Sequence, residues 1–396
     1  MKKSNILILS YDYYPYNLWG VGKNVYEYIN SNFKNYNITL YTSFPRKENK
    51  NFKIITPTQK LYNIFLKGNY IQKNSFRDSN LLNALNVIMI KKIVDYYDNI
   101  KQRPDIILNH GWMTWKIAKE ISKIFNTKII TFVHFYEKQF LSSKNFSSKS
   151  DWNDIYITEN DMFINSKKLI TFSQNQKTEL CKLYDLKDYN ISVINHSTKL
   201  PDLLPENKNT DIVKILFVGR LVEDKGIIEL VKAFNKLSEK YKNLQLTIVG
   251  DGILKDKIEN LSNKKITCTG WLEGIDLYKK YVENDIFCFP TKSETFGMVL
   301  IEAMKYKIPI ITTEGNTVSN IIVNDSTGLT IKLKENSKGI SISINELYKS
   351  IEKLINNEKL RLKLSNNAYL EYVNKYNNSE INEINYLLEE VLKSEK

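Results

Sequence analysis

The chain alternates short apolar runs with amphipathic helical patterns, and it does so in two successive series. Continuous apolar runs of a few residues are typical of strands buried in a parallel sheet. Repeated strand–helix units of this kind predict an α/β fold with one doubly wound parallel sheet in each series. The expected strands are residues 5–9, 37–41, 105–108, 128–132, 168–172 and 191–194 in the first series, and 214–218, 245–249, 266–268, 286–289 and 308–311 in the second.

A polar stretch near residues 200–210, with Pro201 and Pro205, separates the two series and is typical of a linker. The 396 residues are enough for two separate cores. We therefore predict an N-terminal Rossmann-like domain over 1–205 and a C-terminal one over 206–377, facing each other across a cleft. A last helix of about 378–396 is expected to pack back on the first domain.

The balance of charged residues indicates which classes of partner the chain could bind. The chain carries 57 Lys and Arg against 44 Asp and Glu, a net charge of +13, which favours nucleic acid, an anionic membrane or a phosphorylated substrate. No dense basic block and no nucleic-acid module occurs, so we predict no nucleic-acid partner. Peripheral membrane contact stays open. A candidate patch is 60–67, for which a packed amphipathic element is the alternative.

The sequence gives no sign of a metal centre or of export. Cys181, Cys268 and Cys288 lack metal-type spacing. The apolar stretch 6–9 is too short for a signal peptide, and no run approaches the roughly 18 apolar residues of a membrane span. We expect a cytoplasmic protein without a cofactor.

The segment 218–226 carries the first site motif, directly after an expected strand. Gly219 allows the chain to turn tightly. Arg220 and Lys225 supply two cations near a helix that begins close to Gly226, and the helix dipole adds partial positive charge. Such a site suits a diphosphate. For Gly-Arg-Leu alone, a surface turn with solvated charges would be the better interpretation.

The second motif follows the expected strand 286–289. Glu294 lies in a loop, and a helix is expected to start near 296–297 with free N–H groups that can bind phosphate. Glu302 lies in an otherwise apolar helical stretch, where its charge needs a partner. A carboxylate there can accept from two ribose hydroxyls.

Together with residues 249–252 and 269–272, these motifs resemble the retaining GT-B glycosyltransferases of family 4, and Glu294 and Glu302 resemble that family's E-x7-E element. The similarity is sharpest over residues 214–328. The resemblance implies the GT-B architecture and roles around a nucleotide-sugar donor. By this resemblance, Arg220 and Lys225 would bind the diphosphate and Glu302 would bind the ribose. Glu294 would contact the sugar or its phosphate, aided by the backbone of Phe296, Gly297 and Met298. The main chain at Leu272 would hold the base.

In the N-terminal half, Gly20 resembles part of the family's glycine-rich loop and is assigned to donor phosphate, with a plain strand-to-helix turn as the alternative. Trp19 stands where the family usually has Gly. His134 follows a strand and matches the family's active-site histidine near the transferred sugar. His110 and Trp19 are candidates for acceptor contacts, while His196, near the hinge, is interpreted as structural.

We predict metal-independent transfer, because no Asp-x-Asp or His/Cys cluster occurs and Arg220, Lys225 and helix N-termini can meet the phosphate charge. The resemblance implies retention at the anomeric carbon, and UDP is slightly favoured over GDP. The catalytic candidates are His134, Glu294, Arg220 and Lys225. A sugar-nucleotide epimerase, a phosphorylase and a catalytically silent partner subunit are the alternatives.

The acceptor remains open among a glycan, a lipid-linked glycan, a peptide and a small molecule. We place its surface in residues 11–19 and 60–98, where no motif guides the assignment. Ser319 occupies a position where the family usually has Glu, which affects donor-sugar recognition and not the reaction class.

Overall fold

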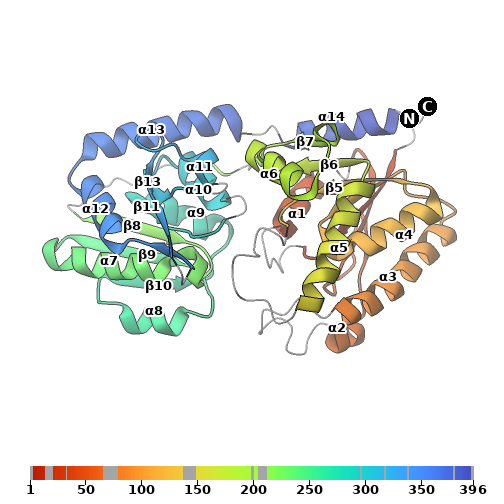
Figure 1. Cartoon of the computed structure of the whole chain (residues 1–396), viewed down its shortest axis with the longest axis horizontal. Helices are drawn as coiled ribbons and strands as arrows, with labels where there is room; N and C mark the ends of the chain where they lie inside the picture. Colours follow the sequence, from red (N-terminus) through yellow and green to blue (C-terminus); the bar gives the residue numbers. More distant parts are fainter. Residues whose placement is uncertain are drawn as a thin grey trace. The chain divides into compact units, whose positions relative to one another are not determined.

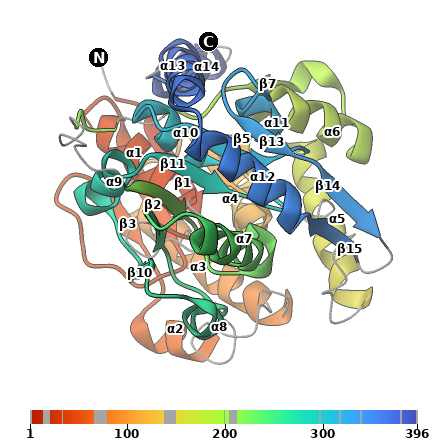
Figure 2. The ribbon, with the colours of Figure 1, turned by 90° about the vertical axis from the view of Figure 1, so that its left-hand side faces the viewer.

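The structure is a computed structural model, and it divides into two compact units, Met1–Ile194 with Ile381–Lys396 and Asn195–Glu380. Each unit is a parallel sheet with helices packed against it (Figure 1, Figure 2). The described residues are 3–13, 21–32, 34–65, 79–136, 149–197, 200–203, 212–294, 297–315, 318–336, 339–377 and 380–393.

Within its described residues, the first unit contains a seven-stranded sheet in the order β3-β2-β1-β4-β5-β6-β7. All neighbouring strands are parallel. The strands are β1 Asn5–Ser10, β2 Asn37–Thr42, β3 Lys53–Ile55, β4 Ile106–His110, β5 Lys128–Phe132, β6 Lys168–Thr171 and β7 Ile191–Val193. The helices are α1 Val21–Asn32, α2 Gln59–Phe65, α3 Ser79–Asn99, α4 Trp115–Phe125, α5 Lys149–Asn165, α6 Gln174–Tyr184 and α14 Glu380–Lys393, with short 3-10 turns at η1 Trp112–Thr114 and η3 Asp188–Asn190.

The second unit contains a six-stranded sheet, again counted over described residues, in the order β10-β9-β8-β11-β12-β13. Its neighbouring strands are also parallel. The strands are β8 Val213–Val218, β9 Leu244–Val249, β10 Ile266–Gly270, β11 Ile286–Phe289, β12 Ile310–Thr313 and β13 Leu329–Ile331, beside an antiparallel hairpin of β14 Leu333–Asn336 and β15 Gly339–Ile342. The helices are η4 Glu223–Lys225, α7 Ile227–Lys240, α8 Lys255–Leu261, α9 Gly274–Glu283, α10 Met298–Lys305, α11 Val318–Ile321, α12 Ile344–Ile355 and α13 Glu358–Lys375.

The two strand orders confirm the predicted doubly wound parallel sheets. In both sheets the strand order reverses beside the first strand of the unit, β1 or β8. Ligands of open α/β sheets bind beyond the carboxyl ends of the strands at such a point. The strands are apolar because both faces are covered, as the complete burial of the side chains from Ile6 to Leu9 shows. The short β3 and β13 and the β14–β15 hairpin were not predicted.

The chain leaves the first unit after Ile194, whereas the sequence placed the domain boundary after residue 205. The difference arises because the polar segment packs with the second unit. Leu200 is buried in the core of that unit, and the Lys305 Nζ lies 2.5 Å from the Asp202 carboxylate. Pro and polar residues therefore mark the linker region but not the point at which the chain changes unit.

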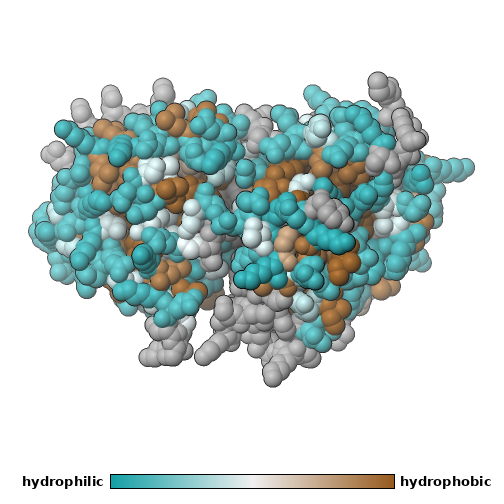
Figure 3. Space-filling model, turned by 45° about the horizontal axis from the view of Figure 1, so that its top comes forward, coloured by the Kyte–Doolittle hydropathy of each residue, from teal (hydrophilic) through white to brown (hydrophobic). Residues whose placement is uncertain are grey.

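The surface in Figure 3 is mostly hydrophilic, with hydrophobic residues visible as separate patches. Leu362 and Leu370 of α13 are among the exposed large hydrophobic residues. Over the part of the chain that the structure describes, no helix is long and apolar enough to cross a membrane.

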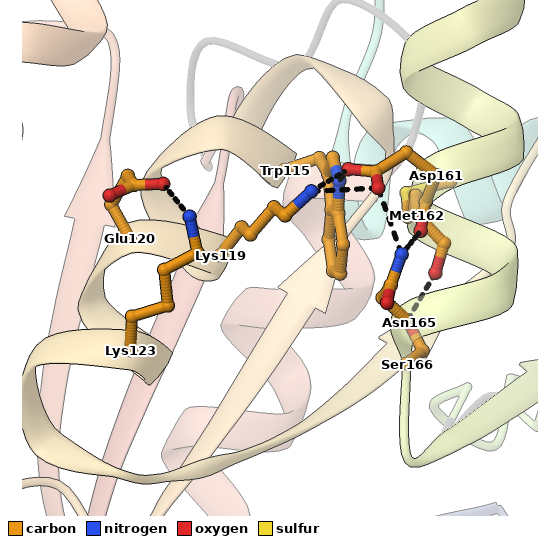
Figure 4. A network of polar contacts seen from close by, with 8 residues as sticks. All are labelled: Trp115, Lys119, Glu120, Lys123, Asp161, Met162, Asn165 and Ser166. Atoms are coloured by element: carbon orange, nitrogen blue, oxygen red, sulfur yellow. Dashed lines mark hydrogen bonds and ion pairs between the residues drawn. The ribbon is translucent and has the colours of Figure 1, made fainter.

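A charged network joins α4 to α5 in the first unit (Figure 4). The Trp115 Nε1–H donates to Asp161 Oδ2 at 2.7 Å, and the Lys119 ammonium lies 2.7 and 2.8 Å from the two carboxylate oxygens. The Asn165 side chain donates to Asp161 Oδ1 as well. Partial burial alone raises the pKa of Asp161, but the donors from Lys119 and Trp115 outweigh it and hold that pKa below its usual value.

Asp161→Asn should lower the free energy of unfolding by about 1–2 kcal/mol at neutral pH, since charged hydrogen bonds are lost at a site that solvent partly screens. Because the native pKa of Asp161 lies below its unfolded value of about 4, this stabilisation is present above that value. It disappears as pH falls through the native pKa. Urea unfolding at pH 7 and at strongly acid pH measures both effects.

Glu120→Gln is the matched control, because Glu120 forms an exposed pair with Lys123 on the same helix. We expect it to cost less than about 0.5 kcal/mol. Equal effects of the two substitutions at pH 7 would contradict the role assigned to Asp161.

Candidate functional site

The loop after β8 is fixed to the loop after β9 by a close backbone approach. A Cβ on Gly250, whose φ is +143°, would lie 1.9 Å from the Gly219 carbonyl oxygen, so no larger residue fits there. The Leu221 N–H also donates to the Asp251 carbonyl at 2.9 Å. These contacts hold the predicted phosphate motif at the carboxyl end of the sheet.

Gly226 ends the turn η4 and precedes the helix α7 in a left-handed conformation, with φ +64°. A Cβ at this position would lie 1.9 Å from the Pro290 carbonyl oxygen, which follows β11. The glycine therefore brings the loop after β8 against the loop after β11. Since β8 and β11 are hydrogen-bonded neighbours, the two sequence motifs meet at one edge of the sheet.

Lys225 connects these two motifs. Its ammonium donates to Glu294 Oε2 and to the Ser293 carbonyl, both at 2.8 Å, and it lies 5.7 Å from the centre of the Phe289 ring. Only 8% of Lys225 is exposed. A buried ammonium is tolerated because it is paired and hydrogen-bonded. The structure thus brings two predicted catalytic residues into direct contact.

The turn around Asp224 supports this pair. The Lys292 N–H donates to the Asp224 carbonyl at 2.6 Å, and the Thr291 hydroxyl lies 3.1 Å from the same oxygen. Thr291 Oγ1 lies 2.7 Å from the Ser293 carbonyl too. Arg220, in the same loop after β8, has an exposed side chain that a bound anion can reach.

The helix α10 begins at Met298, after Gly297 with φ +83°. The N-cap residue is this glycine, which has no side chain with which to cap the first N–H groups of the helix. The Cγ of Glu294 lies 3.6 Å from the position of a Cβ on Gly297, which puts the Lys225–Glu294 pair beside this helix N-terminus. Phe296, the other predicted backbone contact, lies outside the described residues.

Glu302 is 3% exposed and has a partner that the sequence did not indicate. The Tyr281 hydroxyl, from α9, donates to Glu302 Oε2 at 2.8 Å. Burial and then the Glu302 charge raise the pKa of Tyr281 well above its usual value, so the phenol stays a donor. Leu272, predicted to hold the base, follows β10, is half-buried and packs against the core of this unit.

In the first unit, the structure joins two further predicted residues. His110 is the last residue of β4, and His134 follows the adjacent strand β5. Their rings lie within hydrogen-bond distance, with 2.9 Å between His110 Nδ1 and His134 Nε2, and each residue is 8% exposed. Gly20 and Trp19 lie outside the described residues.

His196, which the sequence analysis interpreted as structural, is buried in the second unit. Its Nδ1 lies 2.8 Å from Glu380 Oε1, and the Ser197 N–H donates to the other oxygen of the same carboxylate. Ser319, at the position where the family usually has Glu, accepts from the Gly315 N–H at 2.7 Å and so closes its own turn.

Among the described residues, no group of three or more His, Cys, Asp and Glu side chains is arranged to hold a metal ion. Positive groups near the Lys225–Glu294 pair include Lys225 itself and the N-terminal ends of α7 and α10, and Arg220 lies in the same loop as Lys225. This arrangement can bind a diphosphate and stabilise the negative charge that grows on it as a leaving group.

Sequence reasoning missed Tyr281, the Ser293 carbonyl and the contact between the two histidines. Tyr281 lies in an amphipathic helix, whose apolar side chains the sequence pattern assigns to the core. The pattern does not indicate in which direction the Tyr281 hydroxyl points. A charge in an apolar helix, as at Glu302, was the one available signal that a buried partner exists.

Three comparisons place this geometry among known proteins. Residues 205–371 match the family described as Glycosyl transferases group 1. An uncharacterised glycosyltransferase of Methanocaldococcus jannaschii is 27% identical over 243 residues, which is 57% of this chain and 61% of that protein. The alignment therefore spans less than two thirds of that relative.

Two solved structures share the whole fold. Sucrose-phosphate synthase from Thermosynechococcus elongatus superposes with a TM-score of 0.76 at 15% identity, covering 99% of this chain and 100% of that one. Anabaena Alr3699/HepE, in complex with UDP-glucose, gives a TM-score of 0.69 at 15% identity, covering 98% and 99%. At such identities the likeness concerns the fold, which is the predicted GT-B architecture of two Rossmann-like sheets.

The matched residues 205–371 contain both site motifs, from Gly219 to Gly226 and from Glu294 to Glu302, in the order and on the strand ends that the sequence predicts. Residues 205–371 are therefore the part of the chain that belongs to the glycosyl transferases group 1 family.

Proposed function

We propose that this chain is a glycosyltransferase that moves a sugar from a nucleoside diphosphate sugar to an acceptor hydroxyl. The observation that carries the proposal is the buried Lys225–Glu294 pair, which lies beside the N-terminus of α10 at the carboxyl end of a doubly wound sheet. A UDP-sugar is the favoured donor, in line with the UDP-glucose complex of the fold relative from Anabaena.

In this proposal Lys225 and Arg220 neutralise the departing diphosphate. Charge on the leaving group grows as the glycosidic bond breaks, so cations placed there stabilise the transition state more than the ground state. Glu294 binds the sugar or its phosphate, and the backbone from Phe296 to Met298 supplies N–H donors. The protein's own cations meet the phosphate charge, so we propose that transfer needs no metal.

The remaining donor contacts complete the proposed site. Glu302 accepts from the ribose hydroxyls, the main chain at Leu272 holds the base, and Gly20 allows close approach to the phosphate. His134 contacts the transferred sugar. We propose transfer with retention, in which the acceptor attacks the face that the diphosphate leaves and a phosphate oxygen takes the acceptor proton.

The proposed domain roles follow from the motifs. The second unit carries the donor residues other than Gly20 and His134, and the first unit, with Trp19 and His110 as candidate contacts, takes the acceptor. A cytoplasmic location and a peripheral membrane contact stay predictions from the sequence.

A panel of UDP-, GDP- and ADP-sugars tests the donor assignment by thermal unfolding and by slow hydrolysis. We expect one nucleotide class to raise the melting temperature. Sugars of the same class should be hydrolysed slowly, and NMR should show that the released sugar keeps its anomeric configuration. No stabilisation by any member would contradict the proposal. An epimerase would instead change the sugar while it stays on the nucleotide, and a phosphorylase would require free phosphate.

Arg220→Ala should reduce turnover of the preferred donor by roughly 10²-fold, as loss of one charge-stabilising donor does, without lowering the melting temperature, because the Arg220 side chain is exposed. Lys232→Ala, at an exposed lysine of α7, is the control that removes a cation away from the motif. Turnover that is the same in both variants would remove Arg220 from the site.

Tyr281→Phe tests the ribose assignment of Glu302. Without the phenol, Glu302 Oε2 loses the Tyr281 hydrogen bond, and we expect UDP to bind about tenfold more weakly, which corresponds to about 1.4 kcal/mol. Titration calorimetry with UDP measures this. Tyr306→Phe is the control, since its hydroxyl donates to the Pro201 carbonyl. Unchanged UDP affinity in the Tyr281 variant would mean that the tyrosine only supports the fold.

A further inference from the structure

The two histidines at the carboxyl ends of β4 and β5 form a pair with a defined contact between ring nitrogens, which burial alone would not require. Strands β4 and β5 are adjacent and parallel, with Asn109 opposite Thr131. His110 and His134 therefore leave the same edge of the sheet. Their 2.9 Å contact joins Nδ1 of the first ring to Nε2 of the second.

Neighbouring aromatic rings fix the planes of both imidazoles. The His110 ring stacks on Phe132 with 4.4 Å between centroids and 9° between planes. The His134 ring stacks on Phe172 at 4.9 Å and 28°. Each ring is thus held against an apolar face, and rotation that would exchange its two nitrogens is hindered.

A hydrogen bond between two ring nitrogens needs one proton and one lone pair. The Nε2 of His134 is therefore committed to His110. If His110 donates, neutral His134 carries its proton on Nδ1; if His134 donates, that proton lies on Nε2. The state of one ring fixes the tautomer of the other, and both rings cannot be doubly protonated while the contact persists.

We propose that His110 is a positioning residue that sets the orientation and tautomer of His134. This inference rests on the proposed function, in which His134 contacts the transferred sugar. It differs from the sequence-based role of His110 as an acceptor contact, because the structure commits His110 Nδ1 to His134. A histidine that acts on a substrate through one nitrogen depends on the partner that holds the other.

Two substitutions separate the hydrogen bond from the packing. His110→Phe keeps a ring that can stack on Phe132 but removes both nitrogens. His110→Asn gives up the ring but places an amide atom one bond from Cγ, as Nδ1 is, and that amide can donate or accept. His110→Gln carries the amide one carbon further and serves as the mismatched control.

The first measurement does not depend on activity. The chain has three histidines, so two-bond ¹H–¹⁵N correlations of the histidine-labelled chain give three ring patterns, and His196→Gln assigns the third. We expect His134 to show a single tautomer in the wild type, a changed or averaged pattern in His110→Phe, and recovery in His110→Asn. An unaltered His134 pattern in His110→Phe would overturn the proposal.

The second measurement uses turnover of the preferred donor. We expect His110→Phe to lower kcat by roughly 10- to 100-fold, the range seen when partners that orient a metal-bound histidine are removed, with little change in the donor KM. His110→Asn should recover most of kcat, and His110→Gln should not. Equal kcat in all three variants would overturn the positioning role even where the NMR pattern changes.

His134→Ala distinguishes this inference from the function on which it rests. If His134→Ala is as active as the wild type, the proposed contact of His134 with the sugar fails and His110 has nothing to position. If His134→Ala loses activity while His110→Phe keeps it, only the role of His110 fails.

Discussion

Lys225→Met should lower sugar transfer by roughly 10²- to 10³-fold, the loss typical when one preorganised stabiliser of developing charge is removed. Lys225 is 8% exposed, so its ammonium acts in surroundings where water screens it little. It is also the partner of Glu294, and its removal leaves a carboxylate whose side chain is only 15% exposed. We therefore expect kcat to fall more than donor affinity.

The double variant Lys225→Met/Glu294→Gln separates catalysis from stability. Loss of the ammonium alone takes the 2.8 Å ion pair away from a mostly buried carboxylate, which should lower the melting temperature. Neutralising Glu294 should restore the melting temperature but not turnover. Lys232→Met, at the exposed lysine of α7, controls for the general loss of a positive charge. Recovery of turnover in the double variant would show that Lys225 is needed only to neutralise Glu294.

Gly226→Ala should lower the free energy of unfolding by about 3–5 kcal/mol, a size seen when a special backbone conformation is forced. An added Cβ meets the Pro290 carbonyl oxygen at 1.9 Å, and neither backbone can yield without moving a strand end. Because this contact also brings Lys225 to Glu294, activity should fall with stability. Denaturant unfolding followed by circular dichroism measures the first effect.

Gly274→Ala is the control for backbone conformation. Gly274 has a similar φ of +56°, but no atom lies within 4 Å of the position of an added Cβ. We expect only the cost of the left-handed conformation, about 1–2 kcal/mol. If Gly226→Ala costs no more than Gly274→Ala, the close approach to Pro290 does not constrain the site.

Local periodicity was enough to locate most strands and the two donor motifs. Apolar runs such as 214–218 and 286–289 coincide with β8 and β11, because a buried strand requires apolar residues on both faces. The motifs then fall at strand ends, where residue types predict the turn at Gly219 and a helix start near 296–297. The structure begins that helix at Met298. Short elements such as β3 gave no such signal.

Contacts between distant segments had no counterpart in the sequence pattern. Lys225 and Glu294 are 69 residues apart, and the sequence placed both in the donor site without showing that they touch. Their contact exists because β8 lies beside β11 and Gly226 permits the loops to meet. The Tyr281–Glu302 bond likewise depends on which way two helices face.

The sequence by itself determined the fold class, the order of the strands along the chain and the residue types available at their carboxyl ends, since each of these depends on neighbours within a few turns. Only the tertiary structure decided that His110 meets His134, that Tyr281 holds Glu302 and that the chain changes unit at Ile194. The physical reason is that side-chain partners are set by sheet order and packing direction, which no local periodicity encodes.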